Sequence, residues 1–184
     1  IPTLNAGGSL TECLMSIRDS SVPASEIWIC DGGSSDTTLE IAEQSGARVL
    51  NAPRGRGSQI RAGLLQVKSR YALILHADCR LPANGIERIR AAFRSNPDLI
   101  GGSLGQRFDR GGPVLLLIEA LNEMRASLRG VAFGDQIQFI DLARFPAARF
   151  PAQPLMEDVE LSLRLMEGGR CAYLGIEGEC SADK

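Results

Sequence analysis

The chain has 184 residues, a net charge of −2, 44% hydrophobic residues and 23% charged residues. This composition excludes disordered, collagen-like and disulfide-stapled chains, and the near-neutral charge excludes a global electrostatic footprint for nucleic acid. The five cysteines are odd in number and lack C-x-x-C spacing, which favours a reducing cytoplasm. No apolar run approaches the roughly 20 residues that cross a bilayer. We expect one cytoplasmic domain over residues 1–184. Its amino terminus is expected to be incomplete, because the chain begins at Ile1 without Met, and an incomplete carboxyl terminus is expected as well.

Strand and helix patterns alternate along the first hundred residues. Ser9 with Glu12 three residues on forms a capping-box pattern before the first helix. Further helices are expected to begin near residues 37, 60 and 84, and strands are expected at 26–30, 48–51, 71–75 and 99–104. This order predicts an α/β fold, a Rossmann-like, mainly parallel sheet with helices on both faces.

The second half begins with a helix at Pro113 that carries apolar residues at helical spacing on one face. We interpret this face, which includes Leu117, Leu121 and Leu128, as core packing rather than as a membrane contact. A strand at 136–140 and a helix from about Asp158 follow.

Carboxylates follow two of the predicted strands. Asp31 and Asp36 follow the strand at 26–30, and Asp78 follows the strand at 71–75. Because ligands of parallel sheets bind beyond the carboxyl ends of the strands, these side chains are expected to meet at one edge. Taken singly, each could equally be an ordinary turn or N-cap residue.

The segment from residue 45 to residue 77 contains several cations and no acidic residue. Gly55 and Gly57 flank Arg56 there, a pattern suited to a diphosphate, although the more distant cations fit a solvated helix face. A divalent cation on Asp78 would complement such a ligand. His76, the only histidine, lies two residues before Asp78 and is a candidate metal or phosphate contact.

Two adjacent carboxylates, Glu157 and Asp158, begin the last predicted helix. They are either charges that complement the helix dipole or a general base kept ionised by that dipole. Only one of them can face a cleft. The G-x-S-x-G pattern at Gly101–Gly105 is rejected as a hydrolase motif, because no helix follows it and the only histidine precedes it.

Five motifs in order resemble those of family 2 glycosyltransferases of the GT-A fold, most closely a small stand-alone bacterial branch. They are Ile1–Asn5, Cys30–Thr37, Leu75–Pro82, Gly134–Gln136 and Met156–Leu161. The resemblance implies a mostly inverting transfer of a sugar from a nucleoside diphosphate donor, a UDP-sugar or GDP-sugar, to a hydroxyl acceptor that is lipid-linked or small and polar. A lipid-linked acceptor would place the protein at the inner face of the membrane.

The resemblance also implies roles for individual residues. Asp158 would be the base with Glu157 beside it, Asp78 with His76 would bind Mn²⁺ or Mg²⁺, and Asp135 and Gln136 would lie on the acceptor side. The donor would contact Pro2, Thr3, Asn5, Asp31, Arg56, Arg61 and Asp78. His76 stands where many members have an Asp, which favours Mn²⁺ because it accepts imidazole readily.

Two other functions remain open from the sequence. A non-catalytic or degenerate sugar-nucleotide-binding module would explain His76 and Cys79, while a nucleotidyltransferase would use similar strand-end carboxylates. The latter normally has a basic residue in its first glycine-rich loop, and residues 5–9 have none. Formation of a homodimer is also left open.

Overall fold

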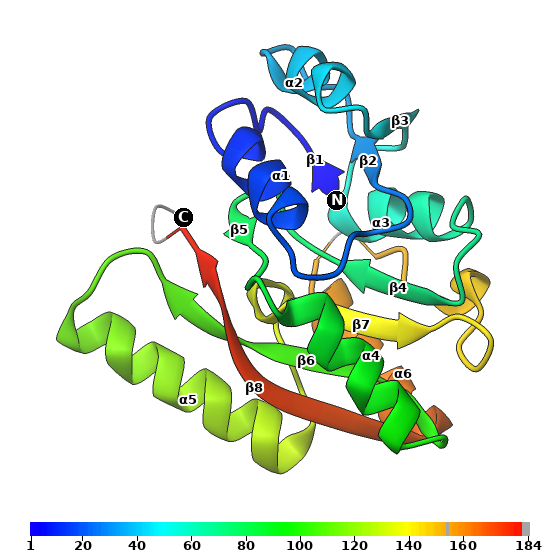
Figure 1. The fold of residues 1–184 in the computed structure, drawn as a ribbon, viewed down its shortest axis with the longest axis vertical. Coiled ribbons are helices and arrows are strands. Elements are labelled where there is room, and N and C mark those ends of the chain that lie inside the picture. Colours follow the sequence, from blue (N-terminus) through cyan, green and yellow to red (C-terminus); the bar gives the residue numbers. More distant parts are fainter. Residues whose placement is uncertain (154, 182–184) are drawn as a thin grey trace.

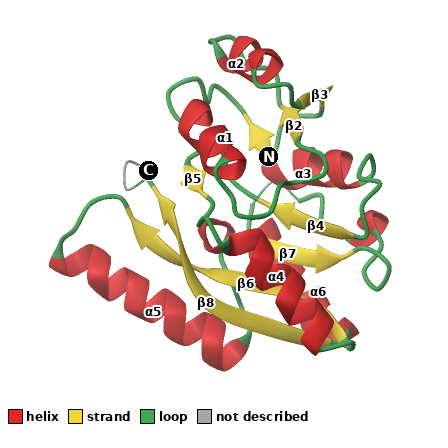
Figure 2. Cartoon of the chain, viewed as in Figure 1, coloured by secondary structure: helices red, strands yellow, loops and turns green. Residues whose placement is uncertain are grey.

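The computed structural model describes residues 1–153 and 155–181 and contains helices on both sides of its strands (Figure 1, Figure 2). The strands are β1 (Pro2–Thr3), β2 (Trp28–Asp31), β3 (Arg48–Asn51), β4 (Tyr71–Ile74), β5 (Cys79–Arg80), β6 (Leu99–Phe108), β7 (Gln138–Asp141) and β8 (Arg170–Cys180). The helices are α1 (Leu10–Arg18), α2 (Thr38–Gln44), α3 (Arg56–Leu64), α4 (Gly85–Ser95), α5 (Pro113–Arg129) and α6 (Glu157–Gly168), with short 3-10 helices η1 (Gly134–Gln136) and η2 (Ala147–Arg149).

The strands form two sheets, in the orders β1-β2-β3 and β4-β7-β6-β8-β5. The expected α/β class is confirmed, and pairing is parallel throughout the first sheet and between β6 and β8. In the second sheet β7 is antiparallel to both β4 and β6, and β5 is antiparallel to β8. The chain leaves β6, passes along α5 and returns through β7 in the opposite direction, so parallel order ends there (Figure 1).

Alternating side chains of β7 place helices on both faces of the second sheet. Phe139 packs with Phe93 of α4 in one buried cluster, whereas Ile140 packs with Leu161 of α6 in another. Neighbouring residues of a strand point to opposite faces, so α4 and α6 cover opposite faces. Burying each of these large side chains stabilises the fold by roughly 1.5–3 kcal/mol.

The start of α1 differs from the predicted capping box. Ser9 is the N-cap residue, but its side chain forms no cap hydrogen bond and its Oγ lies 3.5 Å from the carbonyl oxygen of Ala6. Glu12 instead pairs with Arg80 of β5. A tertiary partner outweighs the local capping interaction.

The core interpretation of the α5 face is wrong. Within the described chain only Asn122 and Ala126 of α5 are buried, and the predicted apolar residues lie on the opposite, solvent-facing side. Leu117 is 59% exposed, Leu121 48% and Leu128 77%. Helical spacing shows which residues share a face, but it does not show which face packs on the sheet. No described helix is long and apolar enough to span a membrane.

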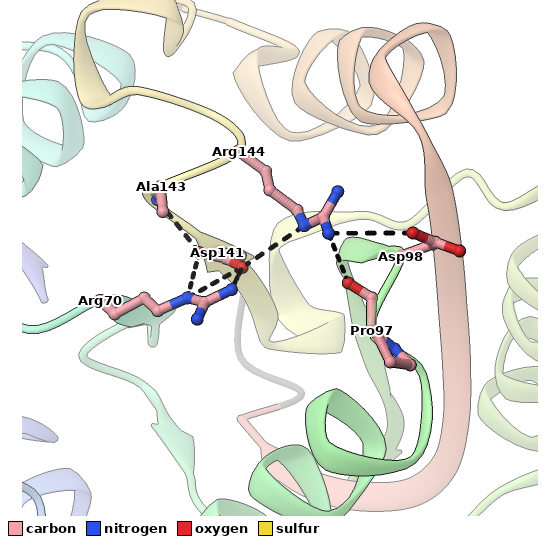
Figure 3. Close-up of polar contacts among 6 residues, drawn as sticks. All are labelled: Arg70, Pro97, Asp98, Asp141, Ala143 and Arg144. Atoms are coloured by element: carbon pink, nitrogen blue, oxygen red, sulfur yellow. Dashed lines mark hydrogen bonds and ion pairs between the residues drawn. The ribbon is translucent and has the colours of Figure 1, made fainter.

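A buried carboxylate anchors the edge of the second sheet at the start of β4. Asp141, the last residue of β7, accepts hydrogen bonds from Arg70 Nε (3.1 Å) and Nη2 (2.7 Å) and from the backbone N–H of Ala143 (3.0 Å). Arg144 also lies beside it and extends to Asp98 and to the carbonyl of Pro97 (Figure 3). These contacts fix β4 against β7 at the end remote from the predicted catalytic residues.

Candidate active site

The carboxyl ends of β1 and β2 are joined by the side chain of Asp31. Its carboxylate accepts hydrogen bonds from Thr3 Oγ1 (3.1 Å), from the Ser34 hydroxyl and from the backbone N–H groups of Gly33 and Ser34 (both 2.8 Å). Burial raises the pKa of Asp31, but these hydrogen bonds outweigh burial and hold it below its ordinary value. An ionised Asp31 therefore shapes the loop after β2.

The loop after β1 is tied to the same turn. Asn5 has a positive φ of 51°, its backbone N–H donates to Ser34 Oγ (2.8 Å), and its Oδ1 accepts from Ser35 N–H (2.9 Å). Thr3, Asn5 and Asp31, which the resemblance assigns to the sugar-nucleotide donor, thus lie together at one edge of the first sheet.

Gln59 is a central residue that the sequence analysis missed. It is 3% exposed, and its Nε2 donates to the carbonyl oxygens of Thr3 (2.6 Å) and Cys30 (2.8 Å), while the backbone N–H of Gly55 donates to its Oε1 (3.3 Å). It therefore fixes the Gly55–Arg56 loop against the ends of β1 and β2. The available signal was a polar residue immediately before Ile60, at the start of a predicted helix.

The predicted metal residues lie near the turn that precedes β5. His76 is buried, and its Nδ1 lies 4.0 Å from Asp135 Oδ1 of η1. Asp78 accepts a hydrogen bond at its carbonyl from the backbone N–H of Ser181 (3.0 Å), beside the paired ends of β5 and β8. Across residues 1–153 and 155–181, no three His, Cys, Asp or Glu side chains are arranged to hold a metal ion.

Arg125 of α5 contacts η1 and the segment before it. Its guanidinium donates to Asn122 Oδ1 (2.9 Å) and Gln136 Oε1 (3.2 Å) and lies 3.5 Å from the ring centroid of Phe133. Burial lowers the pKa of Arg125, and the negative charge of Asp158 opposes this shift. Arg125 was not predicted as a site residue, because its contacts with Gln136 and Phe133 form only once the chain after α5 folds back on the helix.

The two adjacent carboxylates at the start of α6 have different surroundings. Glu157 is fully buried, and Arg56 Nε of α3 lies 3.0 Å from its Oε1. Burial raises the pKa of Glu157, and the positive charge of Arg56 opposes that shift. Asp158 is 8% exposed; its Oδ1 accepts from the N–H of Val159 (2.7 Å), and its carbonyl accepts from Gln138 Nε2 (3.0 Å).

Two further predicted donor-binding residues and the rejected hydrolase motif can also be placed in the fold. Pro2 is buried in β1, and Arg61 is half-buried in the last turn of α3. The segment Gly101–Gly105 lies inside β6, with Ser103 buried in the sheet, which agrees with the rejection of a hydrolase motif.

Three side chains link the elements that carry these groups. Gln59 links the ends of β1 and β2 to α3, Arg56 links α3 to α6, and Arg125 links α5 to η1. The sequence model of glycosyl transferase family 2 matches residues 1–147. The chain belongs to glycosyl transferase family 2.

Curated relatives of this family 2 domain include named transferases. The chain is 35% identical over 112 residues to undecaprenyl-phosphate 4-deoxy-4-formamido-L-arabinose transferase of Edwardsiella ictaluri, covering 55% of the chain and 34% of that protein. It is 30% identical over 104 residues to an uncharacterized glycosyltransferase of Mycobacterium tuberculosis, covering 55% and 45%. The matches thus span less than half the length of these relatives.

Solved structures share the GT-A fold of this family 2 domain. TarS 1–349 of Staphylococcus aureus in complex with UDP-GlcNAc superposes with a TM-score of 0.77 at 18% identity, over 100% of this chain and 57% of that one. Mannosyltransferase PcManGT of Pyrobaculum calidifontis, with GDP-Man and Mn²⁺, gives 0.73 at 18% identity, over 97% and 54%. The expected family and fold are therefore confirmed.

Proposed function

We propose that this domain transfers a sugar from a nucleoside diphosphate donor to a hydroxyl acceptor, with Asp158 as the general base. The observation that carries the proposal is the position of Asp158 in the first turn of α6. Its backbone is held by Gln138, and it lies near the cation Arg125. A carboxylate at this position is a suitable acceptor for the proton of a hydroxyl group.

The sugar-nucleotide donor would bind at the edge formed by β1, β2 and α3. Thr3, Asn5 and Asp31 would line the nucleoside pocket with Pro2, and Arg56 and Arg61 would contact the diphosphate. The exposed outer part of Arg56, whose side chain is 43% exposed, supports this role. UDP-GlcNAc and GDP-Man in the similar solved structures support a UDP-sugar or GDP-sugar donor.

A divalent metal would bind near the turn before β5 only together with the sugar-nucleotide donor. Asp78 and His76 are the residues that would hold Mn²⁺ or Mg²⁺, with Asp135 next to His76. Because the described residues do not assemble three ligands, diphosphate oxygens would have to complete the coordination, as is usual for Mg²⁺. Such an ion would neutralise charge on the leaving diphosphate.

The protein's own residues then perform the remaining steps. Asp158 accepts the proton of the acceptor hydroxyl as that oxygen attacks the anomeric carbon, which gives inversion of configuration. Asp135 and Gln136, held by Arg125 and Gln106, would border the acceptor. The curated relative that acts on undecaprenyl phosphate supports testing lipid-linked as well as small polar acceptors.

The variant Asp158→Asn tests the assignment of the base. It keeps the size of the side chain and removes the proton acceptor, so turnover should fall at least about 100-fold. Binding of the nucleoside diphosphate should stay within about twofold of the wild type, because the base is not a donor ligand. The measurement is the release of UDP or GDP from the sugar-nucleotide donor in the presence of the acceptor. Glu160→Gln, on the same helix, is the matched control.

The outcomes separate the competing functions. Wild-type turnover in Asp158→Asn would contradict the base assignment. Binding without turnover in the wild type would favour the non-catalytic module, and release of pyrophosphate from a nucleoside triphosphate would favour the nucleotidyltransferase.

A further inference from the structure

Glu157 is a buried carboxylate whose charge requires a partner. It is 0% exposed, and neither carboxylate oxygen has an aligned hydrogen bond among the described residues. The guanidinium of Arg56, 3.0 Å from Oε1, is the countercharge. A buried carboxylate without a countercharge is strongly disfavoured, so Arg56 and Glu157 depend on each other for their positions.

The segment that carries Arg56 is itself docked on the chain that leads into α6. A Cβ on Gly57 would lie 2.3 Å from the carbonyl oxygen of Gln153 and 2.8 Å from that of Pro151. Ser58 Oγ donates to the carbonyl of Ala152 at 3.2 Å. The first turn of α3 therefore contacts residues 151–153 through a close backbone approach and a hydroxyl hydrogen bond, and it contacts Glu157 through charge.

We propose that Arg56 and Glu157 are positioning residues for Asp158, joining the diphosphate-binding turn of α3 to the catalytic turn of α6. This inference rests on the proposed function. The inner part of Arg56 contacts Glu157, while its outer part stays accessible to the donor. Because Asp158 follows Glu157 directly, the ion pair fixes the base relative to the leaving diphosphate.

Four variants and one control test the pair. Arg56→Gln and Glu157→Gln each remove one charge, the double variant removes both, and Arg56→Lys keeps the charge. Glu160→Gln is the matched control, because it breaks the half-buried Glu160–Arg164 pair on the same helix. The readouts are kcat, KM for the donor, and hydrogen exchange of the first-turn amides of α6 without ligand.

The expected result is a loss in kcat without an equal rise in KM. Each single Gln variant should lower kcat about 10- to 100-fold, because small displacements of a reacting group have effects of this size. The double variant should lose little more than the worse single variant, since the two residues act as a unit. First-turn amides should exchange at least about tenfold faster in the Gln variants, with partial recovery in Arg56→Lys and no change in the control.

The results that would overturn the positioning role differ from those that would overturn the proposed function. Additive losses, a change in donor KM alone, or unchanged amide exchange in Arg56→Gln would each overturn the positioning role. A folded wild type that transfers no sugar would instead overturn the proposed function, while the exchange measurement would still report whether Arg56 fixes α6.

Discussion

At the scale of single residues, Glu26 is the clearest example of a side chain that holds distant segments together. Its carboxylate accepts hydrogen bonds from the backbone N–H groups of Lys68 and Ser69, from Ser69 Oγ and from Trp28 Nε1. Burial raises the pKa of Glu26, but these hydrogen bonds outweigh burial and lower it to about 2. The contact ties the start of β2 to the loop before β4.

The variant Glu26→Gln should destabilise the fold at neutral pH by about 1–2 kcal/mol, because it removes charge-assisted hydrogen bonds. The folded pKa of about 2 lies below the ordinary value of 4.5, so the stabilisation is present above pH 4.5 and is lost as the pH falls toward 2. Thermal unfolding of the wild type and the variant, measured between neutral pH and about pH 2, checks this loss of stabilisation. Identical pH dependence in the variant and the wild type would contradict the assignment.

Residue types and strand ends predicted much of the candidate site. Asp31 and Asp158 occur at the strand and helix ends that the sequence pattern indicated. Gln59 was missed because its partners are backbone carbonyls of strands far away in the chain. Arg125 was missed because its contacts with Gln136 and Phe133 require the chain after α5 to fold back on the helix. Such partners exist only after the elements have packed, and no local pattern encodes them.

At the scale of elements, the first turn of α3 depends on glycine. Gly55 has a φ of 127°, a conformation that favours glycine, and Gly57 leaves no room for a Cβ against Gln153. These two residues let the predicted diphosphate turn lie against the segment before α6.

The variant Gly57→Ala should lower the free energy of unfolding by about 1–3 kcal/mol, because the added methyl group meets backbone that cannot move away. Gly8→Ala is the matched control, since nothing lies within 4 Å of a Cβ there. Denaturant unfolding compares the two. Equal stability of both variants would show that α3 does not contact residues 151–153 this closely.

The contacts of Asp141 at the edge between β4 and β7 lead to a second prediction at the scale of elements. Asp141→Asn should destabilise the fold by about 2–3 kcal/mol, because Arg70 loses a buried charged acceptor at the β4–β7 edge. Glu160→Gln, which breaks a half-buried i,i+4 helix pair, should stay within about 1 kcal/mol of the wild type. A loss in Asp141→Asn no larger than in this control, measured by chemical unfolding, would rule out an anchoring role.

Element types were predictable from sequence, whereas their packing was less so. Hydrophobic spacing predicted α4 and α5 as helices, but the exposed Leu121 and Leu128 show that spacing alone does not select the inward face. The antiparallel pairing of β7 also escaped prediction, because it depends on the path of a long connection between β6 and β7.

At the scale of the whole molecule, side-chain contacts join elements of both sheets. A mostly apolar cavity of about 400 Å³ lies between β2 and β4, with Trp28 and Leu73 in its lining. Gln59 joins α3 to the ends of β1 and β2, Arg56 joins α3 to α6, and Arg125 joins α5 to η1. We expect the edge formed by β1, β2 and α3 to bind a nucleoside diphosphate.

Calorimetric titration of UDP and GDP, each with Mn²⁺ and with chelator, tests whether this edge binds a nucleoside diphosphate. We expect one diphosphate to bind in the presence of Mn²⁺, and chelator or Asp78→Ala to weaken binding at least about tenfold. Failure of both diphosphates to bind a protein shown to be folded would contradict it.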